Sequence, residues 1–308
     1  MPGLDAQLGR VLIPLVTPFR SDGAVDHSTL ADLSKMVVDR DFCDSIIVGG
    51  STAEFISLSM DERKSILGTV KEAVGGRVPL IAGTGAAHTQ HAIELTRLAE
   101  DLGYDVAMVV APYYLRPTPE GVFHHYRAIA NATRLPLMLY NIPLFTGFNI
   151  DAELLSRLAS LSNVRAIKEE AGINPTQASE FKRVVPADFA IYCGDDTMVL
   201  QVLSQGGVGV VSGGAAVLGD RMKAMIAAYF DGHVEEAQKL HLDMFEFFRS
   251  LNQNGRINPV PLLRDAIGMT WRSVGDPRLP LLPGSEAERE EVGRVLTAIG
   301  ISRVSALV

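Results

Sequence analysis

The stretch Val106-Ala-Met-Val-Val110 is followed by an amphipathic segment at residues 120–133 and then by Leu135-Pro-Leu-Met-Leu139. A short apolar run, a helical pattern and a second apolar run predict two parallel strands joined by a right-handed crossover helix. Both runs are apolar throughout and do not alternate with polar residues, which indicates strands buried on both faces. This stretch therefore predicts an α/β fold with a parallel sheet.

The same pattern recurs in both directions along the chain. Eight apolar runs lie at residues 11–16, 45–48, 78–82, 106–110, 135–139, 164–167, 189–193 and 208–211. Helical patterns separate them at residues 28–40, 59–74, 89–102, 120–133, 151–160 and 175–184. Eight such units favour a closed (β/α)8 TIM barrel over an open, doubly wound sheet.

From about residue 218 onward the apolar runs stop and only helical patterns follow. These patterns lie at residues 218–231, 233–252, 258–270 and 285–299. We therefore predict a barrel domain over residues 1–224, which carries the active site, and a C-terminal helical domain over residues 225–308.

Composition excludes several classes of protein. Of 308 residues, 47% are hydrophobic and 21% charged, which is enough for a large core and excludes a disordered chain. The net charge of −8 disfavours a nucleic-acid partner. No apolar run approaches the roughly 20 residues of a membrane helix, so no membrane partner is expected. Cys43 and Cys193 lie far apart in apolar segments, which indicates buried free thiols and a cytoplasmic location.

Lys168 is the strongest candidate nucleophile. Active sites of these barrels lie at the C-terminal ends of the strands, and of seven lysines Lys168 alone ends a predicted strand. Burial there disfavours the ammonium form, so we expect a lowered pKa and a free amine able to attack a carbonyl. The alternative is a lysine held in an ion pair with Glu169, Glu170 or Asp195.

Two other strand ends carry groups that suit chemistry beside an amine. Tyr140 ends the fifth run, where its phenol could move protons while a carbinolamine forms and loses water. Gly49-Gly50-Ser51-Thr52 follows the second run and offers hydroxyls and backbone N–H groups for a carboxylate. The loop Ser212-Gly213-Gly214 after the eighth run leaves a phosphosugar isomerase open. No histidine pair has metal-ligand spacing, so no metal is expected.

The order and spacing of the motifs resemble the dihydrodipicolinate synthase / N-acetylneuraminate lyase family over nearly the whole chain. The motifs that carry the resemblance are Gly49-Gly50-Ser51-Thr52-Ala53-Glu54, Gly83-Thr84-Gly85, Pro112-Tyr113-Tyr114, Tyr140-Asn141-Ile142-Pro143, Ile167-Lys168-Glu169, Gly194-Asp195-Asp196, Asn258-Pro259-Val260-Pro261 and Arg278-Leu279-Pro280-Leu281. Each motif is weak alone, but together they are specific.

The resemblance implies a class I aldolase or lyase that forms a Schiff base with pyruvate. Lys168 would condense with the keto group, and Tyr140 would act as acid and base. Tyr114 would complete a hydroxyl relay with Ser51 and Tyr140, which in synthase members crosses a subunit interface. The residues implied to bind the substrate are Gly50, Thr52, Phe145, Gly194 and Val211. The resemblance further implies a homotetramer without metal or organic cofactor, because the iminium serves as electron sink.

One position departs from the family's synthases. They carry an arginine two residues after the proline of Tyr-Asn-x-Pro, which grips the carboxylate of aspartate semialdehyde, and this chain has Phe145 there. A phenyl ring cannot replace that bidentate contact. The positions that we align with the lysine-feedback site also differ: Arg63, Ala87 and His91.

We therefore expect first an aldolase or lyase acting on a 2-keto-3-deoxy acid, with pyruvate and an aldehyde as its small-molecule partners. Leu144 and Phe145 would favour an apolar or aromatic aldehyde. The alternatives are 4-hydroxy-tetrahydrodipicolinate synthase, a dehydratase of keto-deoxy sugar acids on the same Schiff base, the phosphosugar isomerase, and a non-enzymatic sensor of a 2-oxo acid.

Overall fold

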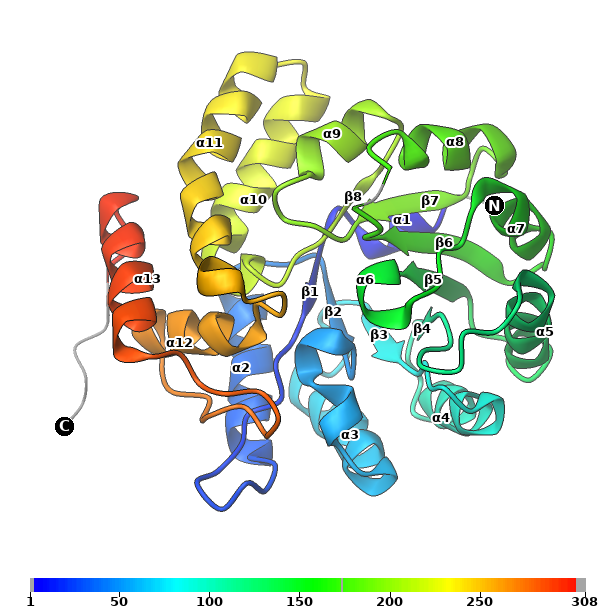
Figure 1. Ribbon diagram of the computed structural model, residues 1–308, viewed down its shortest axis with the longest axis horizontal. Helices are drawn as coiled ribbons and strands as arrows, with labels where there is room; N and C mark the ends of the chain where they lie inside the picture. Colours follow the sequence, from blue (N-terminus) through cyan, green and yellow to red (C-terminus); the bar gives the residue numbers. More distant parts are fainter. Residues whose placement is uncertain (1–2, 173, 303–308) are drawn as a thin grey trace.

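Eight parallel strands form a closed barrel. The computed structural model describes residues 3–172 and 174–302, and in it each strand pairs with the next and β8 pairs with β1. Figure 1 shows the strands at the centre with helices around them. The strands are β1 (Val11–Pro14), β2 (Ser45–Val48), β3 (Leu80–Gly83), β4 (Val106–Val110), β5 (Leu137–Asn141), β6 (Val164–Glu169), β7 (Ala190–Cys193) and β8 (Gly209–Val211). The predicted TIM barrel is confirmed.

Each strand leads into a helix that covers the outside of the barrel. These helices are α2 (His27–Asp39), α3 (Met60–Val74), α4 (Thr89–Asp101), α5 (Pro119–Ala130), α7 (Ala152–Ala159), α8 (Gln177–Val184), α9 (Val199–Ser204) and α10 (Ala215–Phe230). Polar side chains fix several of their starts: Asp26 and Asp151 cap α2 and α7, and Ser59 forms a capping box with Glu62 on α3. Each such cap stabilises its helix by about 1 kcal/mol.

The interior of the barrel is a packed core and not a channel. Alternate residues of the strands point inward, among them Leu12, Ile47, Ile81 and Met138, and all four are fully buried. Helix α1 (Leu4–Leu8), which the sequence did not predict, adds two leucines to this cluster. The reactive groups are therefore confined to the C-terminal ends of the strands.

Two further short helices and one helix boundary differ from the prediction. Helix α6 (Pro143–Thr146) follows β5, and α9 follows β7; with four and six residues, both are too short to show a periodic pattern. Helix α10 begins at Ala215, three residues earlier than predicted, and has a kink at Leu218. The predicted domain boundary at residues 224–225 lies inside α10, and the division into two domains stays a prediction.

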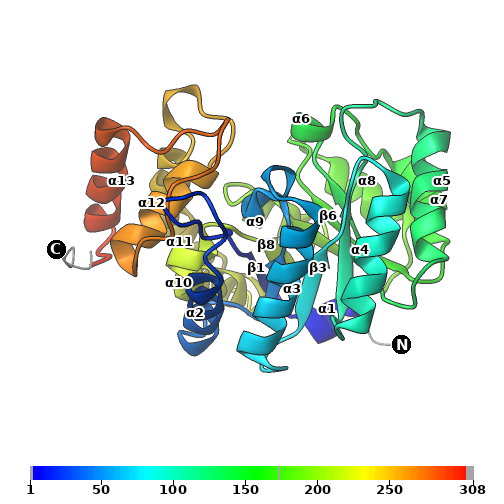
Figure 2. The same cartoon turned by 90° about the horizontal axis from the view of Figure 1, so that it is seen from below.

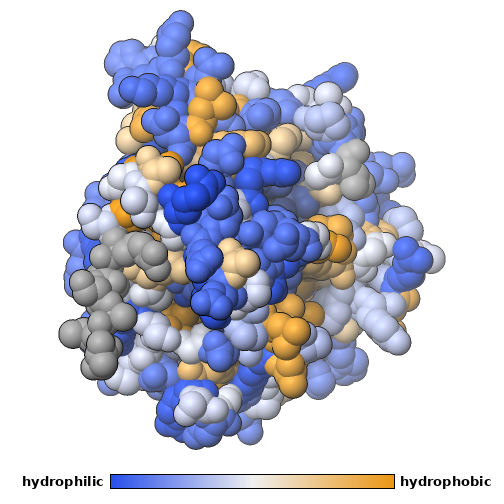
Figure 3. Space-filling view, turned by 60° about the vertical axis from the view of Figure 1, so that its left-hand side comes forward, coloured by the Kyte–Doolittle hydropathy of each residue, from blue (hydrophilic) through white to orange (hydrophobic). Residues whose placement is uncertain are grey.

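Three more helices, α11 (Val234–Ser250), α12 (Val260–Thr270) and α13 (Glu286–Ala298), lie together beside the barrel. Helix α13 contacts both α11 and α12, and these two contact α10; Figures 1 and 2 show the helices grouped on this side of the barrel. Among the described residues no helix is long and apolar enough to cross a membrane. The face in Figure 3 is mostly hydrophilic, with its apolar side chains in small patches. Both cysteines are buried free thiols.

Candidate active site

Lys168 lies where the sequence placed it, at the C-terminal end of β6. It pairs in register with Tyr140 on β5 and with Tyr192 on β7. Only 4% of Lys168 is exposed, and its Nζ lies 4.0 Å from the centre of the Tyr140 ring. The barrel thus brings the amine and the phenol together from neighbouring strands.

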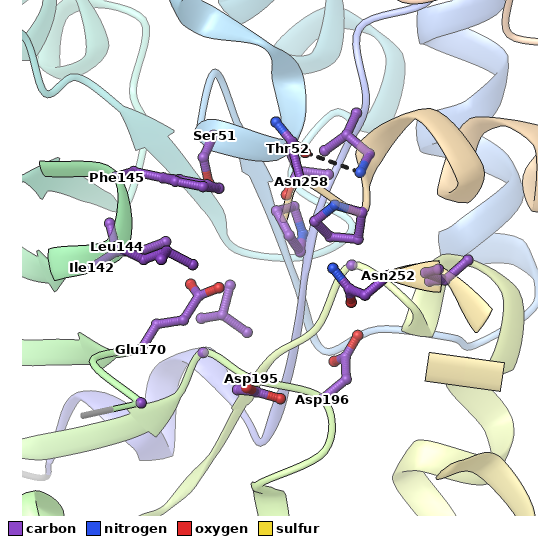
Figure 4. A pocket seen from close by; sticks show the side chains of 18 of the residues that line it. Ser51, Thr52, Ile142, Leu144, Phe145, Glu170, Asp195, Asp196, Asn252 and Asn258 are labelled. Atoms are coloured by element: carbon purple, nitrogen blue, oxygen red, sulfur yellow. Dashed lines mark hydrogen bonds between the residues drawn. The ribbon is translucent and has the colours of Figure 1, made fainter. Parts of the chain in front are cut away.

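A carboxylate lies between these two groups. Glu170 Oε2 is 2.7 Å from Lys168 Nζ and accepts a hydrogen bond of 2.7 Å from the Tyr140 hydroxyl. Its side chain is 27% exposed and points into the cavity in Figure 4. One of the ion pairs that the sequence left open as an alternative for Lys168 therefore forms in the structure.

This pairing reverses the expected pKa shift of Lys168. Burial is the largest single influence and acts to lower the pKa of the ammonium, but electrostatic attraction to Glu170 and Tyr140 and hydrogen bonds to both together outweigh it. The pKa of Lys168 is therefore raised, and the predicted lowering is wrong. The amine must pass a proton to a neighbouring group before it can attack a carbonyl.

Tyr140 is linked to the loop after β2. Its hydroxyl lies 3.2 Å from Ser51 Oγ, and Ser51 and Thr52 lie in a single 3-10 turn at Ser51–Ala53. Burial, followed by the nearby Glu170 carboxylate, raises the pKa of the phenol. Tyr140 therefore remains protonated, and it can donate a proton to a developing oxyanion or alkoxide.

A cavity of about 590 Å³ opens above these residues. Figure 4 shows Leu144 and Phe145 on one side, Glu170, Asp195 and Asp196 on another, and Ser51 and Thr52 across from them. Of the predicted site residues, those that line it are Lys168, Ser51, Thr52, Phe145, Gly194 and Val211. Tyr140 lines a second cavity of about 510 Å³, which shares Ser51 and Phe145 with the first. A small keto acid and an aldehyde fit within such a volume.

Two glycines differ in how they serve the site. A Cβ on Gly194 would lie 2.7 Å from Glu170 Cβ and 2.8 Å from Lys168 Cε, so only glycine leaves room for both side chains. Gly50 lines neither cavity, and a Cβ there would meet Met108 Cε at 3.3 Å. Gly50 thus acts through the packing of its loop and does not contact the cavity.

Phe145 lies on α6 at the rim, 41% exposed, beside the more exposed Leu144. Of the described residues lining the two cavities, only Lys168 and Arg278 carry a positive charge. The Arg278 guanidinium already donates hydrogen bonds to the Glu62 carboxylate and to the backbone carbonyls of Gly23 and Ser57. Neither cation is therefore free to bind the carboxylate of an aldehyde substrate.

Tyr114 is not brought to the site of its own chain. It is 92% exposed, has a left-handed backbone conformation with φ of 70°, and lines neither cavity. The relay within one chain therefore contains Ser51 and Tyr140 but not Tyr114.

The loop after β8 does not offer a free phosphate site. The Gly214 N–H donates to Asp196 Oδ2 at 3.0 Å, and the Ala215 N–H donates to Ser212 Oγ. Burial raises the pKa of Asp196 to about 6. A carboxylate already occupies the place where a phosphate would lie, which disfavours the phosphosugar isomerase.

The sequence named Glu170 only as one of three possible ion-pair partners of Lys168 and did not single it out as a residue of the site. Lys168 and Glu170 are two positions apart, so in an extended chain their side chains point to the same side. The Glu170 N–H donates to the Asn141 carbonyl and so continues the pairing of β5 with β6. Glu169, between them, points the other way and binds Asn141 and Gln177. The alternating direction of side chains along a strand was therefore the sequence signal that could have placed Glu170, and not Glu169, beside Lys168.

Comparison with known proteins agrees with this geometry. The model of the dihydrodipicolinate synthetase family matches residues 7–299. The 4-hydroxy-tetrahydrodipicolinate synthase of Moorella thermoacetica is 42% identical over 96% of this chain and 99% of its own. Its counterpart from Desulforudis audaxviator is 41% identical over 95% and 98%.

Solved structures give the same result. A dihydrodipicolinate synthase from Bacillus anthracis superposes with a TM-score of 0.89 at 37% identity, covering 94% of this chain and 98% of its own. A lysine-bound enzyme from Cyanidioschyzon merolae superposes with a TM-score of 0.91 at 37% identity, covering 96% and 99%.

Proposed function

This chain belongs to the dihydrodipicolinate synthetase family and is a class I aldolase, and we propose that it forms its Schiff base with pyruvate on Lys168. The observation that carries this proposal is the buried amine of Lys168 in contact with Tyr140, which in turn contacts Ser51. A lysine, an acid/base phenol and hydroxyls beside an open cavity supply what imine chemistry needs.

In the proposed mechanism, the deprotonated Lys168 amine attacks C2 of pyruvate. Tyr140 protonates the resulting alkoxide, and loss of water gives the iminium. Ser51 and Thr52 hold the pyruvate carboxylate through hydroxyl and backbone N–H groups. Loss of a proton from C3 gives an enamine, which attacks the carbonyl carbon of an aldehyde and forms the new C–C bond. Hydrolysis of the second iminium then releases the product and regenerates the amine.

Two lines of evidence on the aldehyde substrate disagree. The names of the relatives support one reaction, and the residues at the rim of the cavity support another. The names of the relatives, at about 40% identity over nearly the full chain, favour 4-hydroxy-tetrahydrodipicolinate synthesis from pyruvate and aspartate semialdehyde. This is the alternative that the sequence analysis ranked below a keto-deoxy acid aldolase, and it is now the first reaction to assay.

The apolar side chain of Phe145 at the rim favours the second candidate, which is the reversible aldol reaction of a 2-keto-3-deoxy acid. The rim offers the phenyl ring of Phe145 and the apolar Leu144, and the cavity wall carries the carboxylates of Glu170, Asp195 and Asp196. Such surroundings repel an anionic aldehyde and accept a neutral one.

One pair of assays separates the two candidates. Pyruvate is supplied with aspartate semialdehyde or with neutral aldehydes, apolar and hydroxylated, and its consumption is followed for the wild type and for Phe145→Arg. A synthase consumes aspartate semialdehyde at least as fast as any neutral aldehyde. A keto-deoxy acid aldolase prefers the neutral aldehydes, and Phe145→Arg shifts the ratio of kcat/KM toward aspartate semialdehyde. The absence of any turnover would overturn both.

We also propose a homotetramer in the cytoplasm. Tyr114, Leu115 and Ile56 are 92%, 68% and 72% exposed, and in an assembly Tyr114 of one subunit would approach the site of another. Buried free thiols at Cys43 and Cys193 suit a reducing compartment. Light scattering on the purified chain tests the assembly, and a monomeric mass would contradict it.

A further inference from the structure

Two neighbouring glutamates at the end of β6 have opposite surroundings. Glu169 is buried, and its oxygens accept hydrogen bonds from Asn141, Gln177 and the Ala171 N–H. Glu170 instead contacts Lys168 and Tyr140 through one oxygen, and its side chain faces the open cavity. Glu169 is locked into the scaffold, whereas Glu170 is placed to exchange a proton.

We infer that Glu170 is a catalytic acid and base in Schiff-base formation, in addition to Tyr140. It accepts a proton from the Lys168 ammonium and later returns that proton to the hydroxyl that leaves as water. This role rests on the proposed function, because it requires a keto acid as the partner of Lys168. It does not depend on which aldehyde reacts afterwards.

The protons balance without an outside base. Transfer across the 2.7 Å contact converts ammonium and carboxylate into amine and carboxylic acid. The amine forms the C–N bond to C2 of the keto acid as the C=O π bond breaks. Tyr140 then protonates the alkoxide oxygen and takes one of the two amine protons in exchange, which gives the neutral carbinolamine with one N–H. Glu170 then gives its proton to the carbinolamine hydroxyl as the C–O bond breaks. The sum is ammonium plus ketone going to iminium plus water, with the carboxylate restored.

Tyr140 cannot perform this first transfer while it is bonded as observed. Its hydroxyl donates to Glu170, so its proton is directed away from Lys168. Burial and the adjacent carboxylate raise its pKa, so a phenolate able to take the ammonium proton is disfavoured. Ser51, the other hydroxyl in contact with Tyr140, is a far weaker base than a carboxylate. Glu170 is therefore the base in direct contact with the amine.

Glu170 fills the space beside Lys168 that a substrate must enter, so a second role has to be distinguished. If the carboxylate only blocks the amine, its removal accelerates attack; if it transfers the proton, its removal slows attack. The other charged groups near it are Lys168, Glu169, Asp195 and Asp196, together with the titratable Tyr140 and Cys193.

The test measures the rate of Schiff-base formation with pyruvate, with samples quenched in borohydride at successive times and the adduct counted by intact-protein mass spectrometry. Glu170→Gln keeps the size of the side chain but cannot take a proton. We expect its adduct to form about 10²-fold more slowly at pH 7, in the range of general-base effects. The rate of the variant should rise steeply from pH 6 to 9, because solvent base must replace Glu170, while the wild-type rate changes less.

Glu153→Gln is the charge-matched control, because Glu153 is exposed on α7, and it should form the adduct at the wild-type rate. Equal melting temperatures show that the variants are folded. A Glu170→Gln rate within threefold of wild type, or faster, overturns the inference and identifies Glu170 as a blocking group. Failure of the wild type to form any adduct would overturn the proposed function, and the inference with it.

Discussion

Two ion pairs between a cation and a glutamate lie in different settings, one fully buried and the other at the edge of the cavity. Arg264 on α12 and Glu54, in the loop after β2, meet at 2.8 Å, and each side chain is 2% exposed. Lys168 and Glu170 meet at 2.7 Å, and their side chains are 5% and 27% exposed. The first pair links the C-terminal helices to the barrel, and the second lies at the cavity.

What differs is how many hydrogen bonds surround each charge. The Arg264 guanidinium also donates to the backbone carbonyls of Thr17, Val274, Gly275 and Asp276. Glu54 accepts a further bond from the Arg278 N–H. Lys168 has no comparable set of carbonyl acceptors among the described residues. A fully bonded pair resists change and stabilises the fold, whereas a partly bonded pair beside a cavity can exchange protons and admit a substrate.

The largest expected effect is on activity at the cavity pair. Lys168→Ala should lower turnover by at least about 10³-fold, because the variant has no amine to form the Schiff base. The melting temperature should stay close to that of the wild type. Steady-state assays with pyruvate and the best aldehyde measure the loss. Turnover retained by a folded Lys168→Ala chain would show that another residue is the nucleophile.

The largest expected effect on stability is at the buried pair of Arg264 and Glu54. Arg264→Met should lower the free energy of unfolding by about 3–5 kcal/mol, because Glu54 then stays buried without its partner. Lys168→Met should change it by about 1 kcal/mol or less, since Glu170 can be hydrated from the cavity. Urea denaturation at neutral pH compares the two variants. Equal losses of unfolding free energy in the two variants would contradict the proposed difference between the pairs.

Glu62 and Arg278 form an intermediate case, with 29% and 21% exposed. The hydrogen bond from Arg278 holds the pKa of Glu62 at about 2, below its ordinary value of 4.5. The stability from this depressed pKa is present above pH 4.5 and is lost as the pH falls toward 2. Glu62→Gln should therefore reduce the fall in unfolding free energy across that window by about 1 kcal/mol. Urea denaturation of both proteins at pH 6, 4 and 3 measures this difference. If the unfolding free energy of Glu62→Gln falls with pH as much as that of the wild type, the low pKa of Glu62 does not contribute to stability.

The smallest effect is expected at the surface. Arg77 and Asp39 meet at 2.6 Å but are 46% and 60% exposed. Arg77→Ala should change the free energy of unfolding by less than about 1 kcal/mol, because water screens the pair. The same denaturation series measures it. A loss as large as that at Arg264 would mean that distance, and not burial, governs these pairs.

The sequence predicted the barrel because its strands are buried on both faces, and it predicted Lys168 because this lysine alone ends a strand. It could not predict the direction of the Lys168 pKa shift, which depends on whether Glu169, Glu170 or Asp195 faces the amine. Those three carboxylates are nearly equivalent in sequence, and only backbone geometry separates them. The short helix α6 carries too few residues for a pattern. The proposed approach of Tyr114 to a neighbouring subunit's site would depend on contacts beyond one chain, and those cannot be inferred from strand and helix patterns.

The Schiff base between Lys168 and pyruvate is the step on which the whole proposed function depends. The most direct measurement is borohydride reduction in the presence of pyruvate, followed by peptide mass spectrometry. We expect a single reduced pyruvyl adduct on the peptide that contains Lys168, and no adduct on the folded Lys168→Ala variant. An adduct on another lysine, or no adduct on folded protein with pyruvate in excess, would contradict it.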